Sequence, residues 1–213
     1  MLERFTRFVT YSDKSLPARE RLLNAGADLF AKYGYAGASV REICKRADTG
    51  VNMIHHYFAN KKGLYDEILA SFSDTVLLVP IRIITEPPRS RENLISRFEI
   101  FVEESLEALI ANRQLYEMAV RERMIFAAFQ TYTDRLIAFL DAGKTASLVR
   151  PDLDIDMLTG FVMDRLGNQV LFAEWMQKTY GYSILTDPAY RKRWLRANLD
   201  FVFNGALAPV TTR

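Results

Sequence analysis

Apolar residues recur at helical spacing in residues 39–64, and polar residues fill the opposite faces. The first apolar stripe consists of Val40, Ile43, Cys44 and Ala47. These four positions follow the i, i+3, i+4, i+7 pattern of an amphipathic helix. Ser39 comes directly before them and Glu42 lies three residues later, which is the spacing of a capping box. We therefore predict a short helix that begins at Val40.

A turn and a second short helix follow. Residues 48–50 read Asp-Thr-Gly, three residue types that favour turns. Residues 51–58 then make about two helical turns, roughly 12 Å long at ~1.5 Å per residue, which is close to the width of the major groove of DNA. Ile54 and Phe58 are four residues apart and share the inward face. The residues left pointing outward are Val51, Asn52, His55 and His56.

A third helix begins with two lysines. Asn60 is a suitable cap for this helix, and Lys61 and Lys62 occupy its first turn. The helix dipole disfavours cations at this end, whereas a nearby phosphate would make the same lysines favourable. A local rule broken in this way is expected at a functional site, although a solvated helix end would carry lysines too.

Helical periodicity also dominates the rest of the chain. Gly34 ends an earlier helix, whose predicted buried stripe is Leu22, Gly26, Leu29, Phe30 and Tyr33. The helix that starts at Lys61 extends to about Val79, where Pro80 stops it. Further helices are predicted over residues 91–111, 113–123, 126–143, 154–180 and 188–204. No strand pattern appears, so we predict an all-α protein with an N-terminal three-helix domain containing a helix-turn-helix, and a C-terminal antiparallel helical bundle.

The formal net charge is only +2 over 213 residues, but the charge is unevenly distributed. Residues 1–64 contain 11 Lys and Arg against 6 Asp and Glu, whereas residues 65–213 contain 17 against 20. A basic end on an acidic body suits attraction to phosphates in a preferred orientation. Charge alone leaves an acidic protein partner open, because the excess of positive charge is modest.

Several function classes lack their signatures. There is no nucleophile elbow and no glycine-rich phosphate loop, so the pattern argues against an enzyme. The only two histidines, His55 and His56, diverge by ~100° on a helix, and no cysteine or carboxylate stands at ligand spacing, so no metal or cofactor is expected. No apolar run reaches 18 residues, no secretion signal is present, and Cys44 is the single cysteine. We expect a cytoplasmic protein with no membrane segment and no intrachain disulfide.

Residues 19–69 as a whole resemble a known domain. They read RERLLNAGADLFAKYGYAGASVREICKRADTGVNMIHHYFANKKGLYDEIL. Four features are similar to the amino-terminal domain of the tetracycline-repressor (TetR/AcrR) family. They are the amphipathic helix ending in LFAKYGY, the Ser-Val-Arg-Glu-Ile start of the next helix, the alanine before the turn, and the final residues Tyr57, Phe58, Lys61 and Leu64. This family consists of bacterial one-component transcriptional regulators.

The resemblance implies a set of contacts with double-stranded DNA. Residues 51–57 would enter the major groove, Ser39 to Arg41 would approach the backbone, and Lys61 would hold a phosphate. The expected DNA-contact residues are therefore Ser39, Val40, Arg41, Gly50, Val51, Asn52, Met53, His55, His56, Tyr57 and Lys61.

The sequence departs from the family pattern in two places. Asp-Thr-Gly at residues 48–50 replaces the usual Gly-Val-Ser, and His55 replaces a tyrosine that usually touches a phosphate. Asp48 tolerates a left-handed backbone better than most residues do, so we expect the turn to persist. Gly50 lacks a capping hydroxyl but is still an acceptable cap.

Four regions are predicted along the chain. They are an N-terminal arm over residues 1–18, the helix-turn-helix DNA-binding domain over 19–65, a helical effector-binding and dimerisation domain over 66–207, and a tail over 208–213. The arm carries Arg4, Arg7 and Lys14. It either reaches DNA or forms a frayed terminus or a short packed helix.

The predicted helix 154–180 carries apolar residues on more than one face. We expect one stripe to pack in the core of the protomer and the other to contact a partner. The alternative is a helix fully enclosed in a monomer. By resemblance to the family, the last two helices pair with their symmetry mates as a four-helix interface of a homodimer. The candidate interface residues are Leu158, Val162, Gln169, Phe172, Met176, Trp194 and Phe201.

The middle helices are rich in adaptable and aromatic side chains that suit an apolar cavity with a few polar anchors. The family resemblance is the reason to expect an effector pocket among them. The candidate effector-binding residues are Phe98, Phe101, Met118, Arg121, Glu122, Phe126, Phe129, Met163, Asp164, Asn168 and Trp175.

These patterns lead to one functional hypothesis and one rival. We expect a ligand-responsive homodimeric repressor, which a small-molecule effector releases from a pseudo-palindromic DNA operator. The rival is a helical small-molecule sensor or carrier whose DNA-binding head is degenerate. Activation rather than repression stays open. If either His55 or His56 contacts phosphate or guanine only when protonated, the affinity for DNA should rise as the pH falls.

Overall fold

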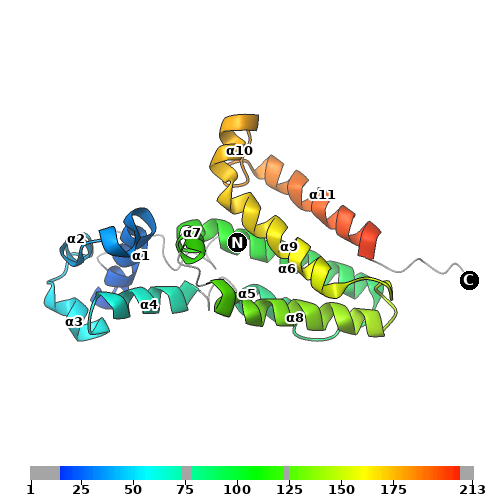
Figure 1. Ribbon diagram of the computed structural model, residues 1–213, viewed down its shortest axis with the longest axis horizontal. Coiled ribbons are helices and arrows are strands. Elements are labelled where there is room, and N and C mark those ends of the chain that lie inside the picture. The colour runs from blue at the N-terminus through cyan, green and yellow to red at the C-terminus, as the bar shows by residue number, and fades with distance from the viewer. Residues whose placement is uncertain (1–14, 73–77, 122–124, 207–213) are drawn as a thin grey trace, which may run out of the picture. The chain divides into compact units, whose positions relative to one another are not determined.

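The structure is a computed structural model that describes residues 15–72, 78–121 and 125–206 (Figure 1). All the elements described in these ranges are helical, which confirms the predicted fold class. The chain divides into two compact units. The first comprises residues 1–76 together with 111–126, and the second comprises residues 77–110 together with 127–213.

The first unit contains five helices: α1 (Ala18–Gly37), α2 (Val40–Arg46), α3 (Asn52–Phe58), α4 (Lys61–Phe72) and α7 (Arg113–Arg121). Helix α1 is its centre, because it contacts each of the other four. The sequence had suggested that α7 belongs with the C-terminal bundle. In the structure α7 instead packs on α1 and α4 and buries Leu115 and Met118.

The core of the first unit follows the predicted stripe of α1, with one correction. Leu22, Leu29 and Phe30 are buried, but Tyr33 is 48% exposed. Gly34 has φ +73°, which interrupts the helical geometry and redirects the chain. Tyr35 therefore takes the inward place, with its ring centroid 4.9 Å from that of Tyr65 in α4.

The second unit contains the other described helices: α5 (Leu78–Ile81), η3 (Arg82–Ile84), α6 (Arg91–Ala111), α8 (Ile125–Thr145), α9 (Ile155–Leu171), α10 (Ala173–Tyr180) and α11 (Pro188–Ala206). The prediction of a single helix over residues 154–180 is wrong. Phe172 has φ −94° and ψ 10°, so the helix breaks there and α10 leaves in a different direction (Figure 1). The predicted helix from Lys61 to about Val79 falls partly on residues outside the described ranges.

Aromatic side chains hold α6, α8 and α11 together. Phe98 of α6 lies 5.9 Å from Phe203 of α11, and Phe101 lies 5.2 Å from Tyr132 of α8, measured between ring centroids. The Tyr132 hydroxyl donates to Ser105 Oγ at 2.6 Å, and Ser105 Oγ donates to the Phe101 carbonyl at 2.6 Å. Burial raises the pKa of Tyr132 well above its ordinary value, so this side chain stays a neutral donor.

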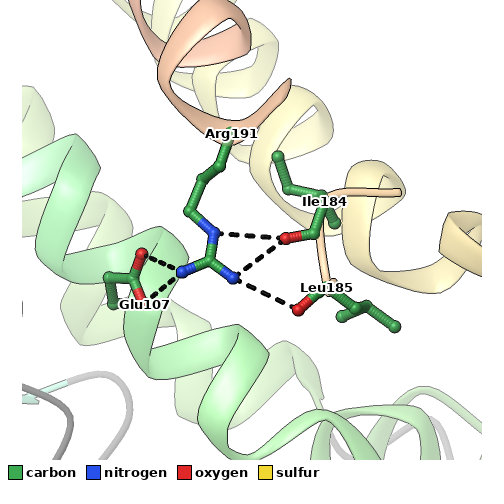
Figure 2. A network of polar contacts seen from close by, with 4 residues as sticks. All are labelled: Glu107, Ile184, Leu185 and Arg191. Carbon is green, nitrogen blue, oxygen red and sulfur yellow. Dashed lines mark hydrogen bonds and ion pairs between the residues drawn. The ribbon is translucent and has the colours of Figure 1, made fainter. Parts of the chain in front are cut away.

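A single arginine ties α11 to α6 and to the loop that precedes α11 (Figure 2). Arg191 Nη1 donates to both carboxylate oxygens of Glu107, at 2.8 and 3.0 Å. The same guanidinium also donates to the carbonyls of Ile184 and Leu185. Both charged side chains are less than a quarter exposed. This network therefore fixes the start of α11 on the bundle.

Aspartate side chains cap two helices of the second unit. Asp154 Oδ1 accepts from the Met157 amide, and Asp187 Oδ1 accepts from the Tyr190 amide, each at 3.0 Å. Among the helices in the described ranges, none combines the length and the apolar character needed to cross a membrane.

Candidate nucleic-acid interface

Helix α3 presents the outward face that its sequence predicted. Ile54 and Phe58 are buried against the rest of the first unit. The exposed side chains are Val51, Asn52, His55 and His56, with Met53 and Tyr57 half-buried beside them. A short helix with its polar side chains free can place them against base edges in a groove.

The turn between α2 and α3 keeps the predicted geometry. Asp48 has φ +51°, the left-handed backbone that aspartate tolerates. Arg21 of α1 reaches this turn: Nε donates to the Ala47 carbonyl at 2.8 Å, and Nη2 donates to the Asp48 carbonyl at 3.3 Å. Nη1 donates to the Leu16 carbonyl at 2.7 Å. One guanidinium thus joins the turn to the segment that enters α1.

An ion pair also connects α1 and α2, and it was not predicted. Arg46 Nη2 lies 2.7 Å from Asp28 Oδ2, and the Asp28 side chain is only 12% exposed. Arg46 is itself exposed, as are Arg41 and Lys45 on the same helix. Burial raises the pKa of the Cys44 thiol on the opposite face, as expected for a core residue.

The two histidines of α3 have different surroundings. His55 Nδ1 lies 2.8 Å from the Ala59 carbonyl. Because a carbonyl only accepts, Nδ1 must carry the proton, which leaves the exposed Nε2 without a proton in the neutral ring. His56 instead contacts the ring of Tyr57 at 4.7 Å between centroids. Nε2 of His55 can therefore donate to a phosphate only when the ring carries both protons.

The start of α4 has the predicted cap, and its two lysines each have a partner within the first unit. Asn60 Oδ1 accepts from the Gly63 amide at 3.0 Å, which confirms the cap. Lys61 Nζ lies 4.6 Å from the centre of the Tyr35 ring, so the ammonium is held over an aromatic face. Lys62 forms an ion pair with Asp66 one turn along the helix. The two cations therefore have different partners.

The start of α2 differs from the expected capping box. Ser39 is the residue before the helix, and its carbonyl accepts the first bond of the helix from the Ile43 amide at 2.9 Å. Its side chain, however, makes no capping hydrogen bond. Ser39 and Arg41 are exposed, Val40 is half-buried, and Gly50 is exposed at the other end of the turn. A hydroxyl that is not used in capping is available to a phosphate.

The residues predicted for a dimer interface are distributed between surface and core. Phe172 and Phe201 are 56% and 67% exposed. Val162 and Trp194 are buried within the second unit, which leaves them little surface for a partner. Leu158, Gln169 and Met176 are half-buried. The exposed large apolar side chains of α9, α10 and α11 are Met157, Phe172, Trp175, Tyr180 and Phe201.

The effector candidates do not all belong to one unit. In the second unit, Phe101 and Phe129 contact Tyr132, and Phe98 contacts Phe101. Met118 is buried in the first unit, where Arg121 is exposed. The remaining described candidates are the half-buried Met163 and the exposed Asp164, Asn168 and Trp175. Glu122 and the side chain of Phe126 lie outside the described residues.

In the part of the chain that the structure describes, no group of three or more His, Cys, Asp or Glu side chains is arranged to hold a metal ion. The residues that sequence reasoning missed are Arg21, the pair of Arg46 with Asp28, and Tyr35 beneath Lys61. Each acts across two helices, so no periodic pattern within one helix signals it.

Comparison with known proteins agrees with this geometry. The model of the family described as bacterial regulatory proteins, tetR family, matches residues 22–68, which span α2, α3 and most of α1 and α4. The HTH-type transcriptional repressor KstR2 of Mycobacterium tuberculosis is 26% identical over 152 residues, covering 68% of this chain and 76% of that protein. KstR2 of Rhodococcus jostii is 29% identical over 157 residues, covering 68% and 74%.

The fold has close counterparts among solved structures. The structure of the ketosteroid transcriptional regulator KstR2 of Mycobacterium tuberculosis superimposes with a TM-score of 0.68 at 23% identity, covering 94% of this chain and all of that one. PfmR from Thermus thermophilus, a TetR family transcriptional regulator, has a TM-score of 0.65 at 17% identity, covering 86% and 97%. At these identities the likeness supports the fold.

Proposed function

Because the chain belongs to the tetR family of bacterial regulatory proteins, we propose that it is a cytoplasmic homodimeric repressor that binds a pseudo-palindromic DNA operator and leaves it on binding a small effector. As a member of this family, the chain is a helix-turn-helix transcriptional regulator and not an enzyme. A dimer would place its two α3 helices one or more helical turns of DNA apart, about 34 to 36 Å per turn.

One observation carries the DNA-binding part of the proposal. Helix α3 buries Ile54 and Phe58 while Asn52, His55 and His56 stay exposed. The buried pair fixes the helix on its scaffold, and the exposed set supplies donors and acceptors for base edges. The basic balance of residues 1–64 adds the attraction to phosphates.

The proposed effector is an apolar small molecule bound in the second unit. Effector binding would change the spacing at which the dimer holds its two α3 helices. A 100-fold loss of operator affinity requires a coupling free energy of about 2.7 kcal/mol, which is within the usual range for allosteric proteins. One relative of known structure is described as a ketosteroid transcriptional regulator, so ketosteroids are the first class to screen.

Selection of bound duplexes from a random DNA library tests the function. We expect the protein to enrich a pseudo-palindromic site and to bind it far more tightly than a scrambled duplex of the same length. Weak binding to both duplexes that disappears on adding salt would instead favour the small-molecule sensor or carrier with a degenerate DNA-binding head.

The Lys61→Ala substitution should weaken binding to operator and scrambled DNA alike. Because Lys61 would neutralise one phosphate, we expect the slope of log affinity against log salt to flatten by about one unit. Titrations of both duplexes at four salt concentrations measure this slope. Lys62→Ala is the matched control, since Lys62 is the adjacent cation but is paired with Asp66. An unchanged slope for Lys61→Ala would contradict the phosphate contact.

Substitutions at the exposed face of α3 should change base preference. Asn52→Ala and His56→Ala each remove a side chain that can bond to a base edge, so we expect a loss of about 1 to 3 kcal/mol of discrimination at one operator position. Repeated selection with each variant reads out the altered position. If a variant selects the same site as the unmodified protein, with the same preference among bases at each position, the substituted side chain makes no base contact.

A further inference from the structure

The carbonyls at the end of α2 need donors from elsewhere in the molecule. The last carbonyls of a helix have no partner within it, and an unpaired carbonyl is costly where water has limited access. The Ala47 amide donates to the Ile43 carbonyl and the Thr49 amide donates to the Cys44 carbonyl, which ends the helix. The carbonyls of Ala47 and Asp48 then receive hydrogen bonds from Arg21.

A guanidinium is suited to this place because its donors have a fixed planar arrangement. Arg21 uses Nε, Nη1 and Nη2 on three different carbonyls. Two of these carbonyls lie at the end of α2, and the third, of Leu16, lies just before α1. A positive charge is also favourable at the C-terminal end of a helix. A lysine could supply only a flexible point donor.

We infer that Arg21 is a positioning residue for DNA reading, which sets the orientation of α3 by holding the end of α2 and the turn against α1. This inference rests on the proposed function. Arg21 holds the turn, and the pair of Arg46 with Asp28 links the last turn of α2 to α1 as well. Together these contacts set the direction in which the chain passes from α2 through Asp48 into α3.

The expected consequence differs between the two kinds of DNA binding. Direct base contacts depend on side chains held to within about 0.5 Å of the productive geometry. Attraction to phosphates depends mainly on the number of charges and tolerates misorientation. Loss of the Arg21 tie should therefore lower the affinity for the selected operator much more than the affinity for scrambled DNA.

The test compares three variants of the full chain: Arg21→Met, Arg21→Lys and Arg19→Met. Arg19→Met is the matched control, because it removes the same charge from the same helix. Arg19 pairs with Glu67 of α4 and lies over the ring of Phe58, and it does not bond to the carbonyls of the turn. We expect Arg21→Met to lower the ratio of operator to scrambled affinity about tenfold or more, which corresponds to the loss of one charge-assisted hydrogen bond. Arg19→Met should leave this ratio within about twofold, and Arg21→Lys should fall between them.

Amide hydrogen exchange provides a second readout that needs no DNA. In Arg21→Met we expect exchange about tenfold faster over residues 47–56 than in Arg19→Met, with the core amides of α1 and α4 unchanged in both. If Arg21→Met does not fold, Arg21→Lys carries both measurements.

The two proposals fail in distinguishable ways. If the unmodified protein selects no operator, the proposed function fails, and the exchange measurement still decides whether Arg21 positions the turn. If the unmodified protein discriminates and Arg21→Met keeps the same affinity ratio, the inference about Arg21 is overturned. Equal losses of the ratio in Arg21→Met and Arg19→Met would overturn it as well, because a charge effect alone would then account for the result.

Discussion

Phe201→Glu is expected to convert the proposed homodimer to a monomer and to lower its operator affinity at least ~100-fold. Phe201 of α11 is 67% exposed, and its ring lies 5.3 Å from that of Phe161 of α9. In the proposed apolar dimer interface, a carboxylate at this position would be buried without a partner, which is strongly unfavourable. A dimer that binds both half-sites gains about 10² to 10⁴ in affinity over one head, and a monomer loses this gain.

Light scattering gives the mass, and titration of the selected operator gives the affinity. Thr131→Glu is the control, since it adds the same charge at an exposed polar position of α8. The control should remain a dimer with unchanged operator affinity. A Phe201→Glu protein that still has the mass of a dimer would exclude this part of α11 from the interface. A monomeric unmodified protein would remove the dimer from the proposal altogether.

Arg191→Met is expected to lower the free energy of unfolding by about 3 kcal/mol, because it leaves a mostly buried carboxylate without its partner. Glu107 loses both charge-assisted hydrogen bonds, and the carbonyls of Ile184 and Leu185 lose their donor (Figure 2). For a chain of this size the loss corresponds to a fall of roughly 6 to 12 °C in Tm. Calorimetry of the purified protein measures both quantities.

Lys192→Met is the matched control for this substitution. Lys192 is the next residue along α11 and is exposed, so its removal should change the free energy of unfolding by less than about 0.5 kcal/mol. Glu107→Gln should have a smaller effect than Arg191→Met, because a neutral amide still accepts from the guanidinium and leaves no buried carboxylate. A Tm for Arg191→Met equal to that of the control would show that the network contributes little.

The sequence was most informative where the structure depends on neighbours within one helix. The inward pairing of Ile54 with Phe58 follows from a separation of four residues, and it alone determines which side chains of α3 face outward. The caps at Asn60, Asp154 and Asp187 are equally local, since each side chain reaches an amide three residues away. Even the left-handed Asp48 could be anticipated, because the preference belongs to the residue type.

The errors have local causes that helical periodicity does not register. Tyr33 and Tyr35 are both aromatic and close to the end of α1, and the positive φ of Gly34 decides which of them points inward. The break at Phe172 divides a stretch whose apolar residues continue without a glycine or proline stop. Ser39 has the residue type and the position expected of a capping residue, but its side chain makes no capping hydrogen bond.

Sequence alone therefore determined the helical class of this protein, the polar face of α3 and the resemblance to a family of regulators, because these depend on spacing along the chain. The tertiary structure decided the rest: the hold of Arg21 on the turn, the pairing of Arg46 with Asp28, the placement of Lys61 over Tyr35 and the return of α7 to the first unit. Each of these joins residues more than fifteen positions apart. A contact of that kind forms only when two helices approach each other at one particular angle, and the pattern within either helix contains no record of that angle.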